Sequence, residues 1–250
     1  MAINEIMLTV SLVVQLKAGS QIGTASGFFY ENNDKLFFVT NVHVVKGDKV
    51  VPDTLRIRLH TDGNDTTKNA NYDIPLYDAA NAPAWKTDLQ STEADVAVLQ
   101  LDKAKLTQKF IVKAWSAANF LPKQYTMQPG EDVFIIGFPL GVSDFPHNLA
   151  VLRGGMVASA YGVPFQGKPL FLTDINLHPG TSGSPVVSKP KSTWVNQENG
   201  NTELTAGTNY YFLGVHSGTL DVKNPADGVQ IGLGASWYAA IVQRIAEQFK

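Results

Sequence analysis

Residues 180–185 read G-T-S-G-S-P, and this stretch decides how the rest of the chain is interpreted. Ser182 lies between two glycines on a predicted tight turn, a setting typical of a serine whose hydroxyl acts as a nucleophile. Upstream, residues 40–45 read T-N-V-H-V-V and residues 94–99 read A-D-V-A-V-L. Each stretch places a candidate catalytic side chain at the edge of an apolar run that can hold it rigidly. Along the chain these side chains are His43, Asp95 and Ser182.

The chemistry of acyl transfer explains why these residue types are needed. A serine hydroxyl is a poor nucleophile near neutral pH, so a neighbouring imidazole, predicted to be His43, must take its proton. A buried carboxylate, predicted to be Asp95, fixes the tautomer of that imidazole and stabilises its cation. The oxyanion that forms needs fixed donors. Gly180 lets the backbone turn so that its own N–H and that of Ser182 can point into one small hole.

Other carboxylates and histidines compete for these roles. Asp88 and Glu93 are rivals of Asp95, which is favoured because it directly precedes an apolar run that would bury it, whereas Asp88 lies in a polar segment. His60 and His147 lie in loop-like sequence, and we expect both to be solvated. No histidines and acids show metal-ligand spacing, so the sequence predicts no metal site.

A serine on a tight turn also occurs in α/β-hydrolases, whose motif is G-x-S-x-G. Ser184 stands where that motif has its final glycine, and His43 precedes Ser182 instead of following it. The alternation of helices and strands that such a fold requires is missing as well. The sequence therefore favours a serine endopeptidase in which the histidine and the aspartate come first.

Residues 173–185 in full read T-D-I-N-L-H-P-G-T-S-G-S-P. This stretch resembles the nucleophile loop T-D-x-x-I-N-P-G-N-S-G-G-P of the HtrA/DegP protease domain, within the trypsin-like (chymotrypsin-fold) serine proteases. The likeness extends to the stretches around His43 and Asp95 and to G-E-D-V-F-I-I-G-F-P-L-G at 130–141, and it covers most of 20–245. It implies hydrolysis of protein or peptide substrates through an acyl-enzyme, with no cofactor. The HtrA group usually carries a PDZ domain after this region, so a further domain or a regulator absent from this chain is an open expectation.

Two departures from that pattern leave the substrate preference open. Thr181 and Ser184 replace an Asn and a Gly, and the later G-V-H-S-G at 214–218 resembles bacterial glutamyl endopeptidases and exfoliative toxins. A histidine at the position of His216 can donate charge-assisted hydrogen bonds to a substrate carboxylate, which favours cleavage after Glu or Asp. Against this, Leu177 stands where a hydroxyl would help, and an HtrA-like pocket prefers small aliphatic residues.

The resemblance also places the residues that would contact substrate. Substrate would lie extended along the backbone after His216, adding a strand to an exposed edge. Ser217 falls where the family has a serine that hydrogen bonds the triad aspartate, and Asn176 falls near the base of the pocket, where the lack of a carboxylate disfavours basic side chains. The predicted substrate-binding residues are Asn176, Leu177, His178, His216, Ser217 and Gly218.

The apolar pattern predicts an all-β fold of two six-stranded antiparallel Greek-key β-barrels with a C-terminal α-helix. We expect residues 1–110 to form the barrel that carries the histidine and the aspartate, and residues 111–250 the barrel that carries the serine and the helix. The helix is expected from Trp237 onward because apolar residues recur there at helical spacing. Residues 60–73 and 188–209 read as surface loops, the second with a hairpin. Predicted strands are 35–40, 54–59, 96–101, 133–136, 149–152, 170–173, 210–215 and 229–234.

Composition narrows the other possibilities. The 250 residues carry a net charge of −2 with scattered lysines and arginines, so no nucleic-acid footprint is visible. There is no cysteine, which permits a reducing compartment. The apolar run at 6–14 follows only Glu5 and no basic residue, so we expect it to be the first strand, not a secretory signal. It is too short to cross a bilayer, and a cytoplasmic location is expected.

One alternative from a different class stays open. A chain with this motif set can be a latent or catalytically silent peptide-binding module, because the sequence does not show the conformation of the oxyanion loop. Labelling of Ser182 by a fluorophosphonate without any activator would distinguish an assembled site from a latent one.

Overall fold

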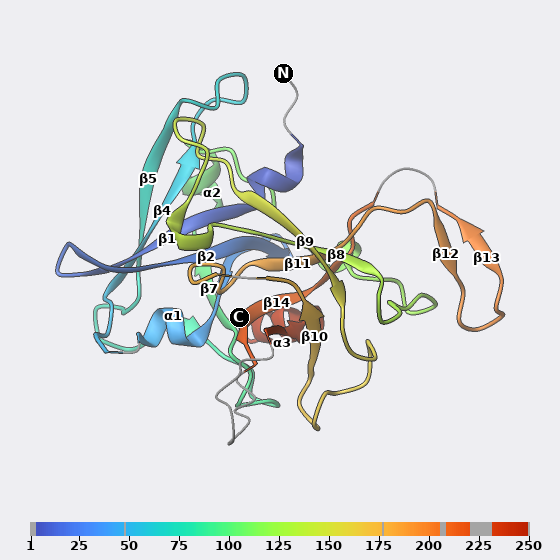
Figure 1. The fold of residues 1–250 in the computed structure, drawn as a ribbon. Helices are drawn as coiled ribbons and strands as arrows, with labels where there is room; N and C mark the ends of the chain where they lie inside the picture. Colours follow the sequence, from blue (N-terminus) through green and yellow to red (C-terminus); the bar gives the residue numbers. More distant parts are fainter. Residues whose placement is uncertain (1–3, 48, 177, 206–208, 221–231, 250) are drawn as a thin grey trace.

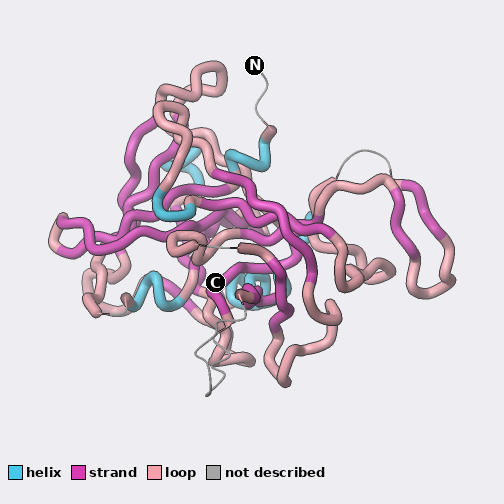
Figure 2. Tube along the Cα trace, in the orientation of Figure 1, coloured by secondary structure: helices cyan, strands magenta, loops and turns pink. Residues whose placement is uncertain are grey.

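Two β-sheets dominate the fold, with short helices and loops connecting their strands (Figures 1 and 2). The all-β class with a C-terminal helix, predicted from the sequence, is confirmed. The computed structural model describes residues 4–47, 49–176, 178–205, 209–220 and 232–249.

The N-terminal half forms a seven-stranded antiparallel sheet in the order β5-β4-β1-β2-β3-β7-β6. Its two edges approach each other where the Ala84 N–H donates to the Leu76 carbonyl at 2.9 Å, so the sheet curls round on itself. The sequence predicts six strands here, and the short β6 makes the seventh. The strands are β1 (Val10–Lys17), β2 (Ser20–Asn32), β3 (Lys35–Thr40), β4 (Thr54–His60), β5 (Asn69–Pro75), β6 (Trp85–Lys86) and β7 (Ala97–Leu101).

The C-terminal half forms a closed barrel of six strands, in the order β10-β15-β14-β11-β8-β9, as the sequence predicts. A separate hairpin, β12 (Thr193–Val195) and β13 (Thr202–Leu204), projects from this barrel within the predicted loop 188–209 (Figure 1). The barrel strands are β8 (Asp132–Gly137), β9 (Val151–Val157), β10 (Leu170–Asp174), β11 (Pro185–Ser188), β14 (Phe212–Thr219) and β15 (Leu233–Tyr238).

Strand β3 shows how the sequence fixes the position of the first functional segment. Successive side chains of a strand point to opposite faces, so Leu36 and Phe38 enter the core of the first sheet while Phe37 and Val39 enter a second core between the two sheets. All four side chains are at most 2% exposed. Burial on both faces holds the end of β3, from which the chain passes directly to His43.

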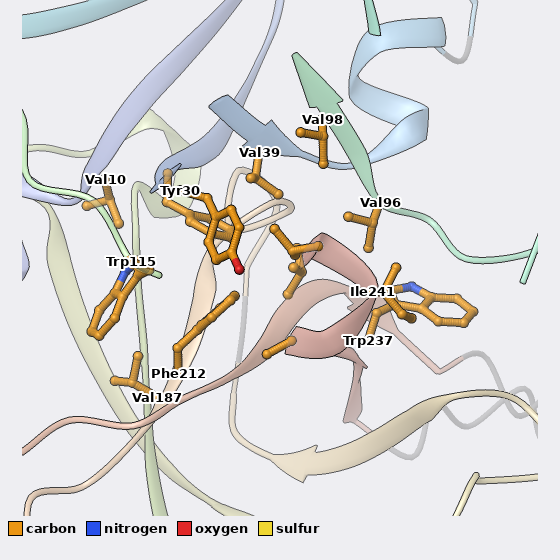
Figure 3. Close-up of a cluster of buried hydrophobic side chains, with 14 of the residues drawn as sticks. Val10, Tyr30, Val39, Val96, Val98, Trp115, Val187, Phe212, Trp237 and Ile241 are labelled. Carbon is orange, nitrogen blue, oxygen red and sulfur yellow. The ribbon is translucent and has the colours of Figure 1, made fainter. Parts of the chain in front are cut away.

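The core between the two sheets fixes how the halves sit against each other. Figure 3 shows Tyr30 from β2 beside Trp115 and Phe212, with Trp237 and Ile241 approaching from the C-terminal helix region. The rings of Trp115 and Phe212 stack with centroids 5.9 Å apart. Burying such side chains is worth roughly 1.5–3 kcal/mol each, so the relative placement of the two halves is strongly favoured.

Six helical segments accompany the sheets in the described residues. Helix α3 begins directly after Tyr238, which ends β15, and it contacts both sheets instead of the second barrel alone. No described helix is long and apolar enough to cross a membrane. The segments are η1 (Glu5–Leu8), α1 (Val42–Lys46), α2 (Lys103–Thr107), η2 (Ala117–Asn119), η3 (Pro139–Gly141) and α3 (Ala239–Ala246).

Several boundaries differ from the predicted ones. The apolar run at 6–14 divides into a 3₁₀ turn and β1, and the predicted loop 60–73 contains the start of β5. The first half of the predicted strand 229–234 lies outside the described residues, and β15 begins within its second half and continues beyond it. The expectation that His60 is solvated is wrong, because it ends β4 and is buried. The division at residue 110 falls in the connection between β7 and β8 and stays a prediction.

Candidate active site

Asp95 is the centre of a hydrogen-bond network that joins both halves of the molecule. Its Oδ2 lies 2.7 Å from Nδ1 of His43 and 2.6 Å from the Ser217 hydroxyl, and its Oδ1 accepts the His43 backbone N–H at 3.0 Å. The side-chain amide of Asn41 donates to the Asp95 carbonyl at 2.6 Å. A carboxylate on Nδ1 holds the proton there and leaves Nε2 of the imidazole to act as the base.

The local sequence explains how His43 reaches this position. Asn41 has extended backbone and starts α1, so His43 lies in the first turn, immediately after the end of β3. Gly47 closes the helix with φ 67°, where a Cβ would lie 2.1 Å from the Val50 carbonyl oxygen. Only glycine tolerates both that φ and that contact, so the helix ends after one and a half turns.

Ser182 lies on a tight turn between residues 178–181 and β11. The turn is closed by the Ser184 N–H, which donates to the Thr181 carbonyl at 3.0 Å. Gly183 adopts φ 83°, and a Cβ there would lie 2.2 Å from the Ser26 carbonyl oxygen, so the close approach of β2 requires glycine. The Ser182 hydroxyl lies 3.1 Å from the Ser217 carbonyl, which competes for its proton.

The peptide group before Gly180 is held by a hydrogen bond to the loop that follows β8. The Pro179 carbonyl accepts the Leu140 N–H at 2.6 Å, and because the two ends of a trans peptide point in opposite directions, the Gly180 N–H points away from that loop. Gly180 has φ 96°, and a Cβ there would lie 2.7 Å from the Phe138 carbonyl oxygen. Among the described residues neither the Gly180 nor the Ser182 N–H has a hydrogen-bond acceptor.

Ser26 of β2 is a residue of this site that the sequence analysis missed. Its buried hydroxyl donates to the Gly180 carbonyl at 2.8 Å and accepts the Phe138 N–H at 2.9 Å. Its backbone N–H donates to the Ser182 carbonyl at 2.9 Å. A buried serine in the otherwise apolar run A-S-G-F-F is the only sequence signal that could have indicated it, since buried polar side chains need partners.

The predicted substrate-binding residues occupy two neighbouring segments. Asn176 and His178 are exposed on the loop before Ser182, and the half-buried Ser217 and Gly218 lie on β14. Leu177 lies outside the described residues. The segments meet where the His216 carbonyl accepts the Gly183 N–H at 2.9 Å.

His216 is buried beneath this surface, at 2% exposure. Burial, with the nearby His43 adding to it, lowers its pKa to about 4, so the ring is neutral near pH 7. Its Nδ1 has no partner in the described part of the chain and faces Gly234, where a Cβ would lie 3.5 Å away. A neutral ring weakens the charge-assisted argument for acidic substrates.

Asp88, the rival of Asp95, is not the solvated carboxylate that its polar segment leads one to expect. Its side chain is only 1% exposed and is paired with Arg244 of α3. Asp88 therefore links the N-terminal sheet to the C-terminal helix, away from His43. No group of three or more acidic or histidine side chains that could hold a metal occurs in the described ranges.

A cleft of about 560 Å³ opens beside the serine and the histidine. Its walls come from the β1–β2 hairpin, from α1 and the loop that follows it, and from the nucleophile loop. The lining residues are Gln15, Ile22, Thr24, Ala25, His43, Val44, Gly47, Lys49, Val50, Pro179, Gly180 and Ser182.

The curled N-terminal sheet, the closed C-terminal barrel and the polar network between them define the class of trypsin-like peptidases. The chain belongs to the trypsin-like peptidase domain family, whose model matches residues 25–195. It is 27% identical over 166 residues to HhoB of Synechocystis sp., a protein named as a serine protease. That alignment takes in 66% of this chain and 32% of HhoB, so the chain corresponds to about a third of that relative.

Solved structures share the fold at low sequence identity. The HtrA-type protease AlgW with a tripeptide superposes with a TM-score of 0.55 at 14% identity, covering 98% of this chain and 60% of AlgW. A serine endoprotease from Yersinia pestis gives 0.56 at 15% identity, with 98% and 63% covered. Rv3671c from M. tuberculosis in an inactive form gives 0.51 at 15% identity, with 97% and 87% covered.

Proposed function

We propose that the chain is a serine endopeptidase in which Ser182 is the nucleophile, His43 the general base and acid, and Asp95 the orienting carboxylate. The observation that carries this proposal is the 2.7 Å contact between His43 Nδ1 and Asp95 Oδ2, reinforced by the Ser217 hydroxyl on the same oxygen. A simple ion pair between His43 and Asp95 would not need a second donor to the carboxylate. Here the Ser217 hydroxyl, on β14 of the other sheet, also donates to Asp95. This geometry fixes both the position and the tautomer of the imidazole.

The proposed reaction follows from these positions. Ser182 Oγ attacks the substrate carbonyl carbon while His43 Nε2 takes its proton, and the developing oxyanion accepts the N–H groups of Gly180 and Ser182. The imidazolium then protonates the leaving amine as the C–N bond breaks, which leaves an ester on Ser182. Water, activated by the same imidazole, releases the acid and regenerates the hydroxyl.

The substrate would bind as an extended strand along β14 at Ser217 and Gly218. By the family resemblance, the loop at Asn176, Leu177 and His178 would form the other wall of the pocket for the side chain before the scissile bond. Because burial keeps His216 neutral, a small aliphatic side chain is the better candidate there than a carboxylate. A peptide-library cleavage profile tests this choice. Frequent cutting after Lys or Arg would contradict both the aliphatic and the acidic preference.

The proposed nucleophile is tested with a fluorophosphonate probe on the wild-type protein and on Ser182→Ala. We expect stoichiometric labelling of Ser182 without an activator, complete loss of labelling in the variant, and strong loss in His43→Ala. Wild-type protein that stays unlabelled while folded would contradict an assembled site.

A second candidate is a latent peptide-binding module. It is favoured by one observation, the 3.1 Å contact that directs the Ser182 hydroxyl toward the Ser217 carbonyl. In that case peptide binding, measured by fluorescence anisotropy, would occur without cleavage, and labelling would need an activator. A cytoplasmic location remains a prediction from the sequence.

A further inference from the structure

The position of the cleft beside Ser182 indicates which part of a substrate, before or after the bond that would be cut, it could hold. Among the described residues, its lining includes none from β14 and neither Asn176 nor His178, which belong to the two segments that would hold the acyl part of the substrate. It is bounded instead by the β1–β2 hairpin and by α1, which lie on the same side of the molecule (Figure 1). Gln15 joins these two walls, because its amide donates to the Val44 carbonyl at 2.7 Å.

The direction of the proposed reaction says what this cleft would hold. The substrate carbonyl oxygen points at the Gly180 N–H and its acyl side runs along β14, so the leaving amine lies on the remaining side, next to the imidazole that protonates it. That side is the cleft, since His43 lines it together with Ser182. The residue that follows the scissile bond would therefore enter it.

The lining residues define the chemistry of that guest. Ile22 and Val50 are exposed apolar side chains, at 38% and 46%, and both line the cleft, Ile22 from the β1–β2 hairpin and Val50 from the segment after α1. Exposed aliphatic side chains that line a concave site gain free energy when an apolar group displaces water. Lys49 is the one lysine or arginine among the lining residues, so a second cation is disfavoured.

We propose that this cleft is a specificity site for the leaving-group side of the substrate, and that it selects a branched aliphatic residue such as leucine immediately after the scissile bond. The inference rests on the proposed serine endopeptidase activity. It concerns a different part of the substrate from the pocket at His216 and is independent of whether that pocket takes acidic or aliphatic side chains.

Acyl transfer to added amines isolates this site. A peptide methyl ester acylates Ser182, and an amino-acid amide then competes with water: its nitrogen bonds to the acyl carbon, the ester C–O bond breaks, and the amine proton passes through His43 to Ser182 Oγ. The ratio of aminolysis to hydrolysis is measured for leucinamide, glycinamide and lysinamide. We expect leucinamide to exceed each of the others by about 10-fold.

Matched variants tie the preference to the cleft. Val50 and Val51 are adjacent and equally exposed, at 46% and 49%, but only Val50 lines the cleft. Val50→Asp should lower the preference for leucinamide over glycinamide at least about fivefold. Val51→Asp should leave it within about twofold, and Ile22→Asp, on the β1–β2 hairpin, should act like Val50→Asp. Hydrolysis of the methyl ester alone should change little in Val51→Asp, the control that does not line the cleft.

The outcomes separate this inference from the proposed function. A wild-type protein that neither reacts with the fluorophosphonate nor hydrolyses any peptide ester overturns the peptidase proposal and this inference with it. Ester hydrolysis with no preference among the three amides overturns the inference alone. So does a leucinamide preference that falls equally in the Val50 and Val51 variants, because it would then arise outside the cleft.

Discussion

The buried hydroxyl of Ser26 gives the sharpest test of how the two halves cooperate. Ser26→Ala removes the donor to the Gly180 carbonyl and the acceptor of the Phe138 N–H, at 2.8 and 2.9 Å, and leaves both backbone groups buried without a partner. An unsatisfied buried group costs about 1–3 kcal/mol, so the free energy of unfolding should fall by about 2–6 kcal/mol.

Activity should fall as well, because Ser26 positions the peptide next to the proposed oxyanion hole. Losing one oxyanion donor outright costs about 100- to 1,000-fold in kcat, which sets the upper limit for a donor that is displaced but still present. We expect kcat for peptide hydrolysis to fall about 10- to 100-fold in Ser26→Ala, with KM within about threefold. The rate of fluorophosphonate labelling should fall in parallel with kcat.

The chain offers a matched control for this variant. Ser11 of β1 is also fully buried. Its hydroxyl accepts the Arg58 N–H at 3.2 Å and lies 3.1 and 3.2 Å from the carbonyl oxygens of Arg58 and Leu12, and the Arg58 carbonyl also accepts the side-chain amide of Asn148 at 3.0 Å. Ser11→Ala leaves the Arg58 N–H without a partner, so it should lose about 1–3 kcal/mol in urea unfolding but keep kcat. If Ser26→Ala is destabilised at least as much as Ser11→Ala and retains kcat within about twofold, Ser26 has only a structural role and the reasoning is refuted.

Three further predictions concern the proposed triad, His216 and small molecules. The double variant of His43→Ala and Ser182→Ala should be no slower than the slower single variant, because the two groups act as a unit; additive losses in kcat would contradict this. Burial lowers the pKa of His216 to about 4 from 6.5, so the unfolded chain binds a proton that the folded one does not between these pH values. Stability should therefore fall by about 3 kcal/mol as the pH drops from 6.5 to 4, a loss that urea titrations of His216→Gln should lack, and identical pH profiles would remove His216 as the cause. With no cysteine in the chain, activity should be unchanged by strong reductant, and we expect the same in EDTA; a loss in EDTA would reveal a required metal ion.

The parts of the site that the sequence could predict are those encoded within short segments. The turn at Ser182, the strand that ends before His43 and the apolar run after Asp95 each need only a few neighbouring residues. Their meeting follows from the barrel fold, which the recurring apolar strands indicate. Strand positions were predictable for the same reason, because alternation along a strand is a local property.

The remaining features depend on partners that are distant in sequence. Asp88 lies in a polar segment, yet it is more deeply buried than Asp95, because Arg244 reaches it from a helix 156 residues further on. His216 cannot be recognised as buried and neutral from its neighbours in the chain, since the burial comes from strands on both sides. Whether a charged side chain is buried depends on the assembled fold. An apolar run directly after a carboxylate in the sequence is therefore a poor predictor of its burial.

Ser26 lies in a short apolar segment of the first sheet, and the hydrogen-bond partners of its hydroxyl and of its N–H lie in the second half of the chain. It therefore shows why the site depends on both halves. The first sheet supplies His43 and Asp95, and the second barrel supplies Ser182 and Ser217. If packing in the shared core were the only link, a small rotation of one half would separate the proposed base from the proposed nucleophile without changing either segment. The hydrogen bonds of Ser26 to Gly180 and Ser182 tie the loop that carries Ser182 to β2, which pairs with β3, and β3 ends three residues before His43. The distance between the proposed base and the proposed nucleophile therefore depends on a path of neighbouring hydrogen bonds, and a single serine hydroxyl, which motif comparison does not detect, is part of that path.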